Sequence, residues 1–216
     1  SGCNPTLGYI PAGTVNDFAS SLNLPKNMIK AAEVVLTGEE FACDIGSFND
    51  KYFAYVAAFG IFTDVSYQTS QQFKNMLGRL AYLLEGVKRI GAIETYHLTI
   101  TCDGETIEDD FMLGLITNST SVAGLKGISH QHALLDDGLF EVLLIKMPST
   151  LLELQIIINS MVTNDLNEKF IHIYKASHTK ISSATPVPWT LDGEFGGEQT
   201  EITIKNHQKR LHIMKA

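Results

Sequence analysis

The chain contains 216 residues and carries a formal net charge of −8 at pH 7. This acidic balance argues against a nucleic-acid-binding protein, because such proteins neutralise phosphates with a basic surface. It also argues against strong non-specific adhesion to anionic lipid, so we expect any membrane contact to be local or transient. Hydrophobic residues make up 44% and charged residues 19% of the chain. These values are ordinary for a globular protein, and the length allows one large domain or one and a fraction.

Several features of the chain favour a cytoplasmic protein. No apolar run approaches the length of a membrane span, and no basic and apolar leader occurs. Cys3, Cys43 and Cys102 are widely separated and odd in number, which favours reduced thiols over a disulfide framework or a zinc site. The chain starts at Ser1-Gly2 without a methionine, and we therefore expect a piece of a longer protein, either cut by design or truncated.

The first structured segment is expected between Gly8 and Pro25. A short apolar piece leads through a glycine turn into a helix, where Thr14 followed three residues later by Asp17 fits the capping pattern. Phe18 and Leu22 lie four apart on one face, as a packed helix requires. A strand, a glycine turn and a helix N-terminus favour a bound phosphate, although a plain capped helix explains the same pattern. Residues 26–36 form a short segment of mixed apolar and polar composition.

From Phe41 onward the pattern is mainly β. Residues 41–46 and 51–59 predict a hairpin, and so do residues 96–102 and 107–117, which flank Asp103-Gly104. A strongly apolar strand is predicted at 139–145. Spacings of three and four predict amphipathic helices over 76–90 and 151–161. Short strands are predicted after the second helix, at 170–176, 178–183, 188–191, 200–205 and 210–214.

Together these elements predict an α+β fold. We expect a mainly antiparallel, sandwich-like β domain with two attached helices, because hairpin-connected strands outnumber helices. The tail end of an α/β nucleotide-binding domain precedes it. The boundary falls near residues 37–41, which divides the chain into 1–38 and 39–216, with the option that the final strands return to the first domain.

One motif connects the chain to a known family. Pro11-Ala-Gly-Thr-Val-Asn-Asp-Phe-Ala19 resembles the motif of the diacylglycerol kinase catalytic family, especially its soluble bacterial lipid kinases, and the resemblance runs from about residue 7 to the end. It implies an ATP- and Mg²⁺-dependent kinase that phosphorylates a diacylglycerol-like lipid at the bilayer surface. Gly13, Thr14 and Asn16 would contact the nucleotide, and Asp17 would complete the polar wall of the cleft.

The other candidate residues are carboxylates in glycine-containing turns, since stock phosphate-loop, zinc and nucleophile-elbow motifs do not occur. From the sequence pattern alone, Asp44 is interpreted as a residue at the edge of a hairpin. The same kind of evidence leaves Asp136-Asp137-Gly138 as either a polar turn or a cation-binding loop. The resemblance places Asp44 in an acidic cluster at the active cleft. It also implies a structural Mg²⁺ held by Asp137 with the carbonyls of Leu134 and Leu139, and leaves open whether Asp136 or Asp137 is the ligand.

The triplet Asp-Gly-Glu occurs twice. At 103–105 it lies between clean alternating strands, and we interpret it as a solvated hairpin tip without a catalytic role. At 192–194 its context resembles a family segment whose glutamate acts as general base on the lipid hydroxyl. A positioned carboxylate can accept that proton, so Glu194 is the main catalytic candidate and Asp192 the weaker one.

The family's Gly-Gly-Asp-Gly-Thr motif does not occur in these 216 residues. Because its glycine turn forms the main phosphate cradle, we expect this chain alone neither to bind ATP tightly nor to turn over. We also expect apolar surface around residues 7–36 to favour a homo-oligomer. Two alternatives remain: a sphingoid-base or NAD kinase of the same superfold, and a non-catalytic lipid-binding or regulatory β domain.

Overall fold

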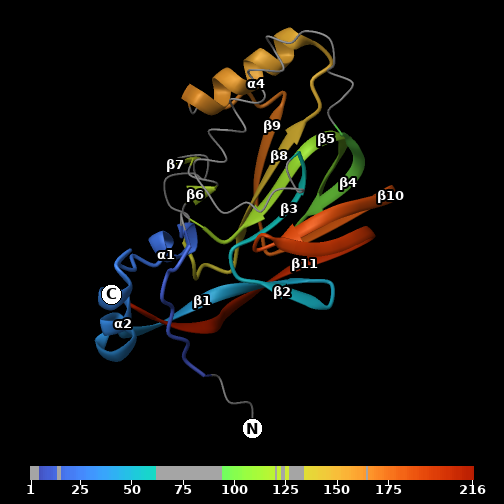
Figure 1. Ribbon diagram of the computed structural model, residues 1–216. Helices are drawn as coiled ribbons and strands as arrows, with labels where there is room; N and C mark the ends of the chain where they lie inside the picture. The colour runs from blue at the N-terminus through green and yellow to red at the C-terminus, as the bar shows by residue number, and fades with distance from the viewer. Residues whose placement is uncertain are drawn as a thin grey trace.

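The computed structural model describes residues 5–13, 16–61, 94–119, 121–122, 125–126, 134–163 and 165–216. The predicted helix over 76–90 and residue Thr14 lie outside these ranges. Figure 1 shows a strongly curved sheet with α4 (Leu151–Thr163) at one end and the short helices α1 (Asp17–Ser21) and α2 (Met28–Thr37) at the other. No helix in these ranges is both long and apolar enough to cross a bilayer.

The described strands confirm the predicted antiparallel β architecture. One sheet has the order β2-β1-β11-β10-β3-β5-β8-β9, and β4 pairs with both β10 and β5. A separate pair consists of β6 (Ser121–Val122) and β7 (Leu125–Lys126). The strands of the large sheet are β1 (Glu39–Phe48), β2 (Lys51–Phe53), β3 (Val56–Gly60), β4 (Tyr96–Cys102), β5 (Glu105–Thr117), β8 (Phe140–Lys146), β9 (Ile171–Ala176), β10 (His178–Leu191) and β11 (Glu194–Lys215).

The C-terminal strands are fewer and longer than predicted. The segments predicted at 178–183 and 188–191 form the single strand β10, which absorbs Pro186 at a register shift between Ser182 and Val187. Proline cannot donate to a ladder, and a bulge removes that requirement. Likewise 200–205 and 210–214 belong to β11, whose register against β1 shifts between Cys43 and Ile45.

Two hydrophobic clusters lie on opposite faces of the sheet. On the inner face the fully buried Trp189 contacts two phenylalanine rings, with centroid distances of 5.1 Å to Phe48 and 4.9 Å to Phe59. On the outer face, Ile157 of α4 packs in a cluster with Val56 and other residues of β3, β5 and β8. Because side chains alternate along a strand, β3 serves both clusters and all five of its residues are buried.

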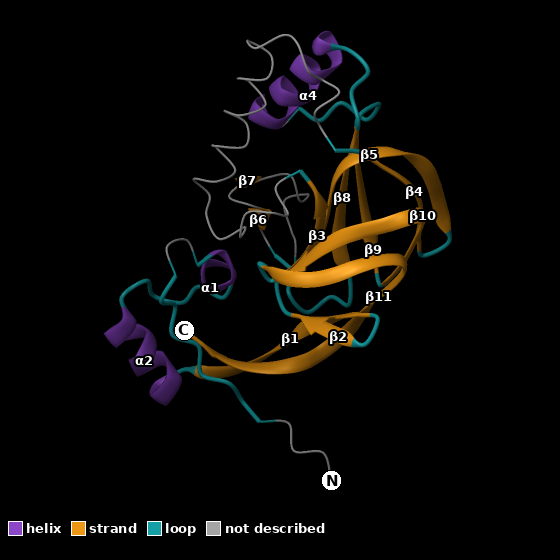
Figure 2. Cartoon of the chain, turned by 45° about the vertical axis from the view of Figure 1, so that its right-hand side comes forward, coloured by secondary structure: helices purple, strands orange, loops and turns teal. Residues whose placement is uncertain are grey.

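A third cluster joins the two ends of the chain and positions the site described below. Leu22, the C-cap residue of α1, packs with Cys43 of β1 and Ile213 of β11. Leu7 adds to the end of β11, where its N–H donates to the His212 carbonyl at 2.8 Å and its carbonyl accepts from the Met214 N–H at 2.9 Å. The N-terminal segment and the C-terminal strand therefore lie side by side, as both views show (Figures 1 and 2).

The expected capping pattern of the first segment was wrong. The helix α1 starts at Asp17 with Asn16 as N-cap, so Asp17 occupies the first helical position and not the third position of a Thr14 capping box. Asn16 has a φ of 57° and makes no side-chain capping bond to the helix. The helix α2, which was not predicted, occupies Met28–Thr37, and Asn27 caps it by accepting from the N–H groups of Ile29 and Lys30.

Candidate active site

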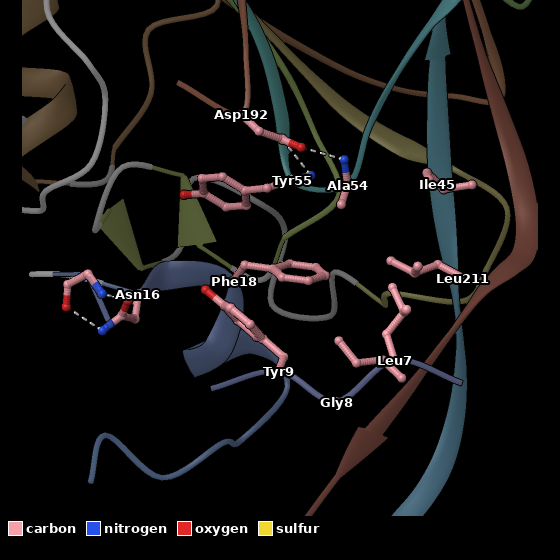
Figure 3. A pocket seen from close by; sticks show the side chains of 12 residues that line it. Leu7, Gly8, Tyr9, Asn16, Phe18, Ile45, Ala54, Tyr55, Asp192 and Leu211 are labelled. Carbon is pink, nitrogen blue, oxygen red and sulfur yellow. Dashed lines mark hydrogen bonds between the residues drawn. The ribbon is translucent and has the colours of Figure 1, made fainter. Parts of the chain in front are cut away.

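A cavity of about 480 Å³ opens where the N-terminal segment, the β2–β3 connection and the β10–β11 turn meet (Figure 3). Its walls come from segments that are far apart in the sequence. The lining residues are Leu7, Gly8, Tyr9, Gly13, Asn16, Phe18, Ile45, Ala54, Tyr55, Asp192, Leu211 and Ile213. Three of the predicted site residues, Gly13, Asn16 and Asp192, therefore line one cavity.

The turn from Gly13 to Asn16 is held by two reciprocal hydrogen bonds. The Gly13 N–H donates to Asn16 Oδ1 at 2.9 Å, and Asn16 Nδ2 donates to the Gly13 carbonyl at 2.6 Å. A Cβ on residue 13 would lie 2.8 Å from Asn16 Oδ1, so a larger residue there would displace the Asn16 side chain from its two hydrogen bonds. Asparagine tolerates the left-handed conformation of residue 16 because its short side chain bonds locally. Thr14 and the side chain of Asp17 lie outside the described parts of the chain, so their predicted roles stay predictions.

Asp192 anchors the turn between β10 and β11. Its Oδ1 accepts from the N–H groups of Tyr55 and Val56, both at 2.8 Å, and its Oδ2 accepts from Ala54 N–H at 2.7 Å. Asp192 and Gly193 have φ values of 52° and 90°, as a type I′ hairpin turn requires. These contacts assign Asp192 the role of fixing the hairpin that carries Glu194, which is not among the described residues that line the cavity.

Glu194 is the first residue of β11 and pairs with Leu191 across the turn. Its side chain is exposed, two residues beyond Asp192. A carboxylate at this position stays accessible to a hydroxyl group that approaches the cavity from solvent. The turn thus presents one carboxylate that is occupied by backbone N–H groups and one that faces outward.

Asp44 is fully buried and lies in the bulge of β1 opposite β11. Its Oδ2 accepts from the Gly138 N–H at 2.7 Å and from Asn206 Nδ2 at 3.1 Å, and its Oδ1 accepts from the Lys209 N–H at 2.9 Å. Lys209 has a φ of 54°. Asp44 therefore connects β1 to the Asp136–Gly138 loop and to the bulge of β11. It does not line the cavity, although its neighbour Ile45 does.

The Asp137 side chain closes its own loop. Its Oδ1 accepts from the Leu139 N–H at 3.0 Å, and its Oδ2 lies 3.9 Å from Lys175 Nζ. The described residues contain no group of three or more His, Cys, Asp or Glu side chains that could hold a metal. A site with one carboxylate and backbone carbonyls is nonetheless compatible with Mg²⁺, because this ion usually binds few protein ligands and keeps several water ligands. The assignment of Asp137, Leu134 and Leu139 as ligands stays a prediction, and Asp136 instead pairs with Lys209 at 3.3 Å.

One titratable residue near this loop was not predicted. Glu141 is 3% exposed, and its burial raises the pKa of the carboxyl from 4.5 to about 7 against the opposing effect of Lys175. Its Oε1 lies 3.5 Å from Lys175 Nζ, and its buried Oε2 has no hydrogen-bond partner in the described parts of the chain. A glutamate within the apolar run of β8 was the available signal, because a charged side chain in a buried strand is rare.

The fold and the site define a class before any relative is considered: an antiparallel, sandwich-like β domain whose cavity combines a glycine–asparagine turn with an acidic hairpin. Residues 56–213 match the family model of the YegS C-terminal NAD kinase beta sandwich-like domain. Residues 2–48 match that of the diacylglycerol kinase catalytic domain. The chain belongs to the diacylglycerol kinase catalytic family, a family of lipid kinases.

Individual relatives agree with this assignment. The chain is 33% identical over 211 residues to a diacylglycerol kinase from Bacillus subtilis (strain 168), which covers 97% of the chain and 69% of that protein. It is 36% identical over 209 residues to one from Staphylococcus carnosus (strain TM300), which covers 94% of the chain and 67% of that protein. A solved putative diacylglycerol kinase from Bacillus anthracis str. Sterne superposes with a TM-score of 0.75 at 24% identity, over 98% of the chain and 68% of that structure. The last likeness establishes the fold.

Proposed function

We propose that this chain is part of an ATP- and Mg²⁺-dependent lipid kinase that phosphorylates the hydroxyl of a diacylglycerol-like lipid. The observation that carries the proposal is the shared cavity, in which the Gly13–Asn16 turn and the Asp192 hairpin meet. The turn carries the Gly-Thr-x-Asn-Asp motif by which the chain resembles the family. The hairpin carries the Asp-Gly-Glu motif with the candidate catalytic carboxylate. Their meeting supports a common role in one reaction.

Glu194 acts as the general base in this proposal. A primary hydroxyl is a poor nucleophile, and a carboxylate that accepts its proton during attack assists phosphoryl transfer. The hydroxyl oxygen forms the new bond to phosphorus, its proton passes to Glu194, and ADP leaves with the oxygen that bridged the β- and γ-phosphates. Asp192 is a positioning residue, because its carboxylate is occupied by three backbone N–H groups.

Asp137 would hold Mg²⁺ together with the carbonyls of Leu134 and Leu139. When bound, this ion would supply structural cross-linking of the loop, and ATP would supply the phosphoryl group. Asp44 would keep the loop in place by accepting the Gly138 N–H. The backbone of the Gly13–Asn16 turn would approach the nucleotide, since Gly13 has no side chain to prevent it.

The test is a phosphorylation screen with radiolabelled ATP, using the longer protein that contains this chain. Diacylglycerol, a sphingoid base and NAD are offered as acceptors, and we expect label in phosphatidic acid only. Substitution Glu194→Gln removes the base, and we expect the rate to fall about 10²–10⁴-fold. Label in NAD or in a sphingoid base would instead support the related kinases, and no label in any acceptor would support a non-catalytic lipid-binding domain.

The same assay applied to the 216-residue chain tests a further part of the proposal. The chain does not contain Gly-Gly-Asp-Gly-Thr, and we expect no turnover without this phosphate-binding turn. Detectable phosphatidic acid from the purified chain would contradict this part alone.

A further inference from the structure

We infer that Asn118, which directly follows β5, is a positioning residue of the candidate active site. Its side chain fixes the separation between Asp44 of β1 and Tyr55 of the β2–β3 connection, and through Tyr55 it acts on the hairpin that carries Glu194. This inference deepens the proposed function and rests on it for the identity of the reaction. The contacts that carry it belong to the folded chain and can be tested without any phosphoryl transfer.

Three consecutive polar residues lie in the interior at the end of β5. Thr117, Asn118 and Ser119 are 0%, 0% and 1% exposed. Buried polar side chains cost free energy unless they find hydrogen-bond partners. The partners of these three residues lie in three different segments of the chain, so the end of β5 joins segments that are far apart in the sequence.

Asn118 joins β1 to the β2–β3 connection. Its Nδ2 donates to the Asp44 carbonyl at 2.9 Å, and its backbone N–H donates to the Tyr55 carbonyl at 3.0 Å. Thr117 Oγ1 donates to the same Tyr55 carbonyl at 3.1 Å. Because the side-chain bond to β1 holds residue 118 in place, it also sets the position from which the backbone N–H of this residue reaches Tyr55.

The two residues that Asn118 contacts belong to the two carboxylate networks of the site. The Tyr55 N–H donates to Asp192 Oδ1 at 2.8 Å (Figure 3). The Asp44 carboxylate accepts from the Gly138 N–H at 2.7 Å. Asn118 therefore connects the hairpin that carries the candidate base to the loop that carries the candidate metal ligand.

Ser119 extends this connection to the first helix. Its Oγ lies 3.0 Å from the Oγ of Ser21, the last residue of α1. The same helix starts directly after the Gly13–Asn16 turn. Residues 117–119 thus contact α1, β1 and the β2–β3 connection, which together hold the segments that meet at the cavity.

The Asn118 side chain is more polar than packing requires. Its Oδ1 is buried and has no hydrogen-bond partner in the described parts of the chain. A buried acceptor without a donor lowers stability, so stability explains an amide at this position poorly. The direction in which Nδ2 donates explains it better, because this bond fixes Asp44 relative to Tyr55.

The first test compares Asn118→Ala with Asn49→Ala in the longer protein. Asn49 is the matched control because its amide also bonds to the backbone of another strand, where Nδ2 donates to the Glu201 carbonyl at 3.1 Å and Oδ1 accepts from the Thr203 N–H at 2.8 Å. None of these three residues is among the described residues that line the cavity. For Asn118→Ala we expect kcat to fall up to about 10²-fold with KM little changed, since a small misplacement of a catalytic group has an effect of this size. For Asn49→Ala we expect kcat within a factor of about two.

A second measurement separates positioning from a general loss of folded protein. If Asn118 acts through Glu194, Asn118→Ala should have little further effect on kcat once Glu194→Gln is present, because residues that act as a unit are not additive. A loss of folded protein would instead lower kcat by the same factor in both backgrounds. Equal factors would overturn the inference.

Hydrogen exchange of the 216-residue chain gives a readout that does not depend on the reaction. In Asn118→Ala we expect the N–H groups of Tyr55 and Gly138 to exchange at least about tenfold faster relative to the amides of β4, because local opening is reported residue by residue. In Asn49→Ala these ratios should not change. Unchanged ratios in Asn118→Ala would overturn the inference even if the kinase proposal holds.

A milder variant covers the case in which Asn118→Ala does not fold. Thr117→Val keeps the shape of the side chain and removes only the Oγ1 bond to the Tyr55 carbonyl. We expect the Tyr55 N–H to exchange faster in this variant, and unchanged exchange would contradict the inference. Faster exchange in both variants of a protein that fails every phosphorylation assay would sustain Asn118 as a positioning residue and reject the kinase.

Discussion

Two hairpins of this chain turn through the same three residues, Asp-Gly-Glu. At Asp103-Gly104 the φ values are 43° and 101°, and at Asp192-Gly193 they are 52° and 90°. In both turns the aspartate carboxylate accepts N–H groups from another segment. Asp103 accepts from the Ser177 and His178 N–H groups at 2.8 and 2.9 Å, and from Ser177 Oγ.

The hairpins differ in what lies next to them. Asp192 holds the β2–β3 connection and lines the cavity that the N-terminal segment helps to form. Asp103 holds the short connection between β9 and β10. Asp103 lies at an exposed turn between β4 and β5, as predicted, and its carboxylate also anchors the β9–β10 connection. The two turns therefore share their backbone conformation and the role of their aspartate carboxylates. Only the Asp192 turn has a candidate function, because the cavity lies next to it.

The largest effect on stability is expected for Asp44, a buried aspartate whose carboxylate also accepts backbone N–H groups. Asp44→Ala would leave the N–H groups of Gly138 and Lys209 without their acceptor. Because each buried donor left unsatisfied costs about 1–3 kcal/mol, we expect the free energy of unfolding to fall by about 3–5 kcal/mol in urea titrations. Asp50→Ala in the exposed β1–β2 turn is the control, with a change below about 0.5 kcal/mol. Similar losses in both variants would show that Asp44 is no anchor.

A carboxylate whose pKa is raised by burial should make stability depend on pH. The Glu141 carboxyl has its pKa raised from 4.5 to about 7, so the folded chain binds its proton more tightly than the unfolded chain. Stability should therefore fall as the pH rises from about 4.5 to about 7. Relative to Glu141→Gln, we expect the native chain to lose at most about 3 kcal/mol between pH 4.5 and pH 8. Parallel stability curves of the two proteins would contradict this prediction.

Substitution of the two hairpin aspartates, Asp192 and Asp103, should have equal effects on stability and unequal effects on activity. Asp192→Asn and Asp103→Asn each replace one acceptor oxygen by an amide NH₂ group and keep a side chain that tolerates positive φ. We expect each to reduce the free energy of unfolding by about 1–3 kcal/mol. Only Asp192→Asn should also lower kcat in the longer protein, because it releases the turn that carries Glu194. Equal kcat values in both variants would remove the functional distinction between the hairpins.

The smallest expected effect concerns association. Met28, Ile29 and Leu36 of α2 are 58%, 74% and 83% exposed, and an apolar helix surface of this kind favours contact with a second copy. We predict that the sedimentation coefficient of the 216-residue chain rises with concentration. The double substitution Ile29→Ser and Leu36→Ser should reduce that rise, whereas Leu152→Ser and Val162→Ser on α4 should not. A sedimentation coefficient that is constant up to millimolar concentration would refute the prediction.

The sequence was most informative where signals were local. The turn Asp103-Gly104, the hairpin at 47–50 and the helix from Leu151 each carry their own pattern of spacing and turn residues, and each was predicted. The helix α2 was missed because its apolar residues follow one another closely at 31–36 and were not interpreted as one helix face. Its N-cap, Asn27, was the signal available.

Non-local interactions explain the other differences. The two halves of β11 were separated because the bulge near Lys209 resembles a turn, and the acceptor that stabilises the bulge is Asp44, 165 residues away in sequence. The function of Asp192 as an anchor is similarly invisible in the sequence, since its partners lie in the β2–β3 connection. The family resemblance identified the motif residues. The contacts of each carboxylate could not be predicted, because they join segments that are far apart in the sequence.

The most direct test of the central claim is a pair of substitutions at the two equivalent glutamates, Glu194 and Glu105, in the longer protein. Glu194→Gln should reduce kcat for diacylglycerol about 10²–10⁴-fold, with KM little changed. Glu105→Gln should leave both constants within a factor of about two, because surface substitutions of this kind have small effects. If the two variants have the same kcat, the hairpin at the cavity has no special role and the assignment of Glu194 as the base is wrong.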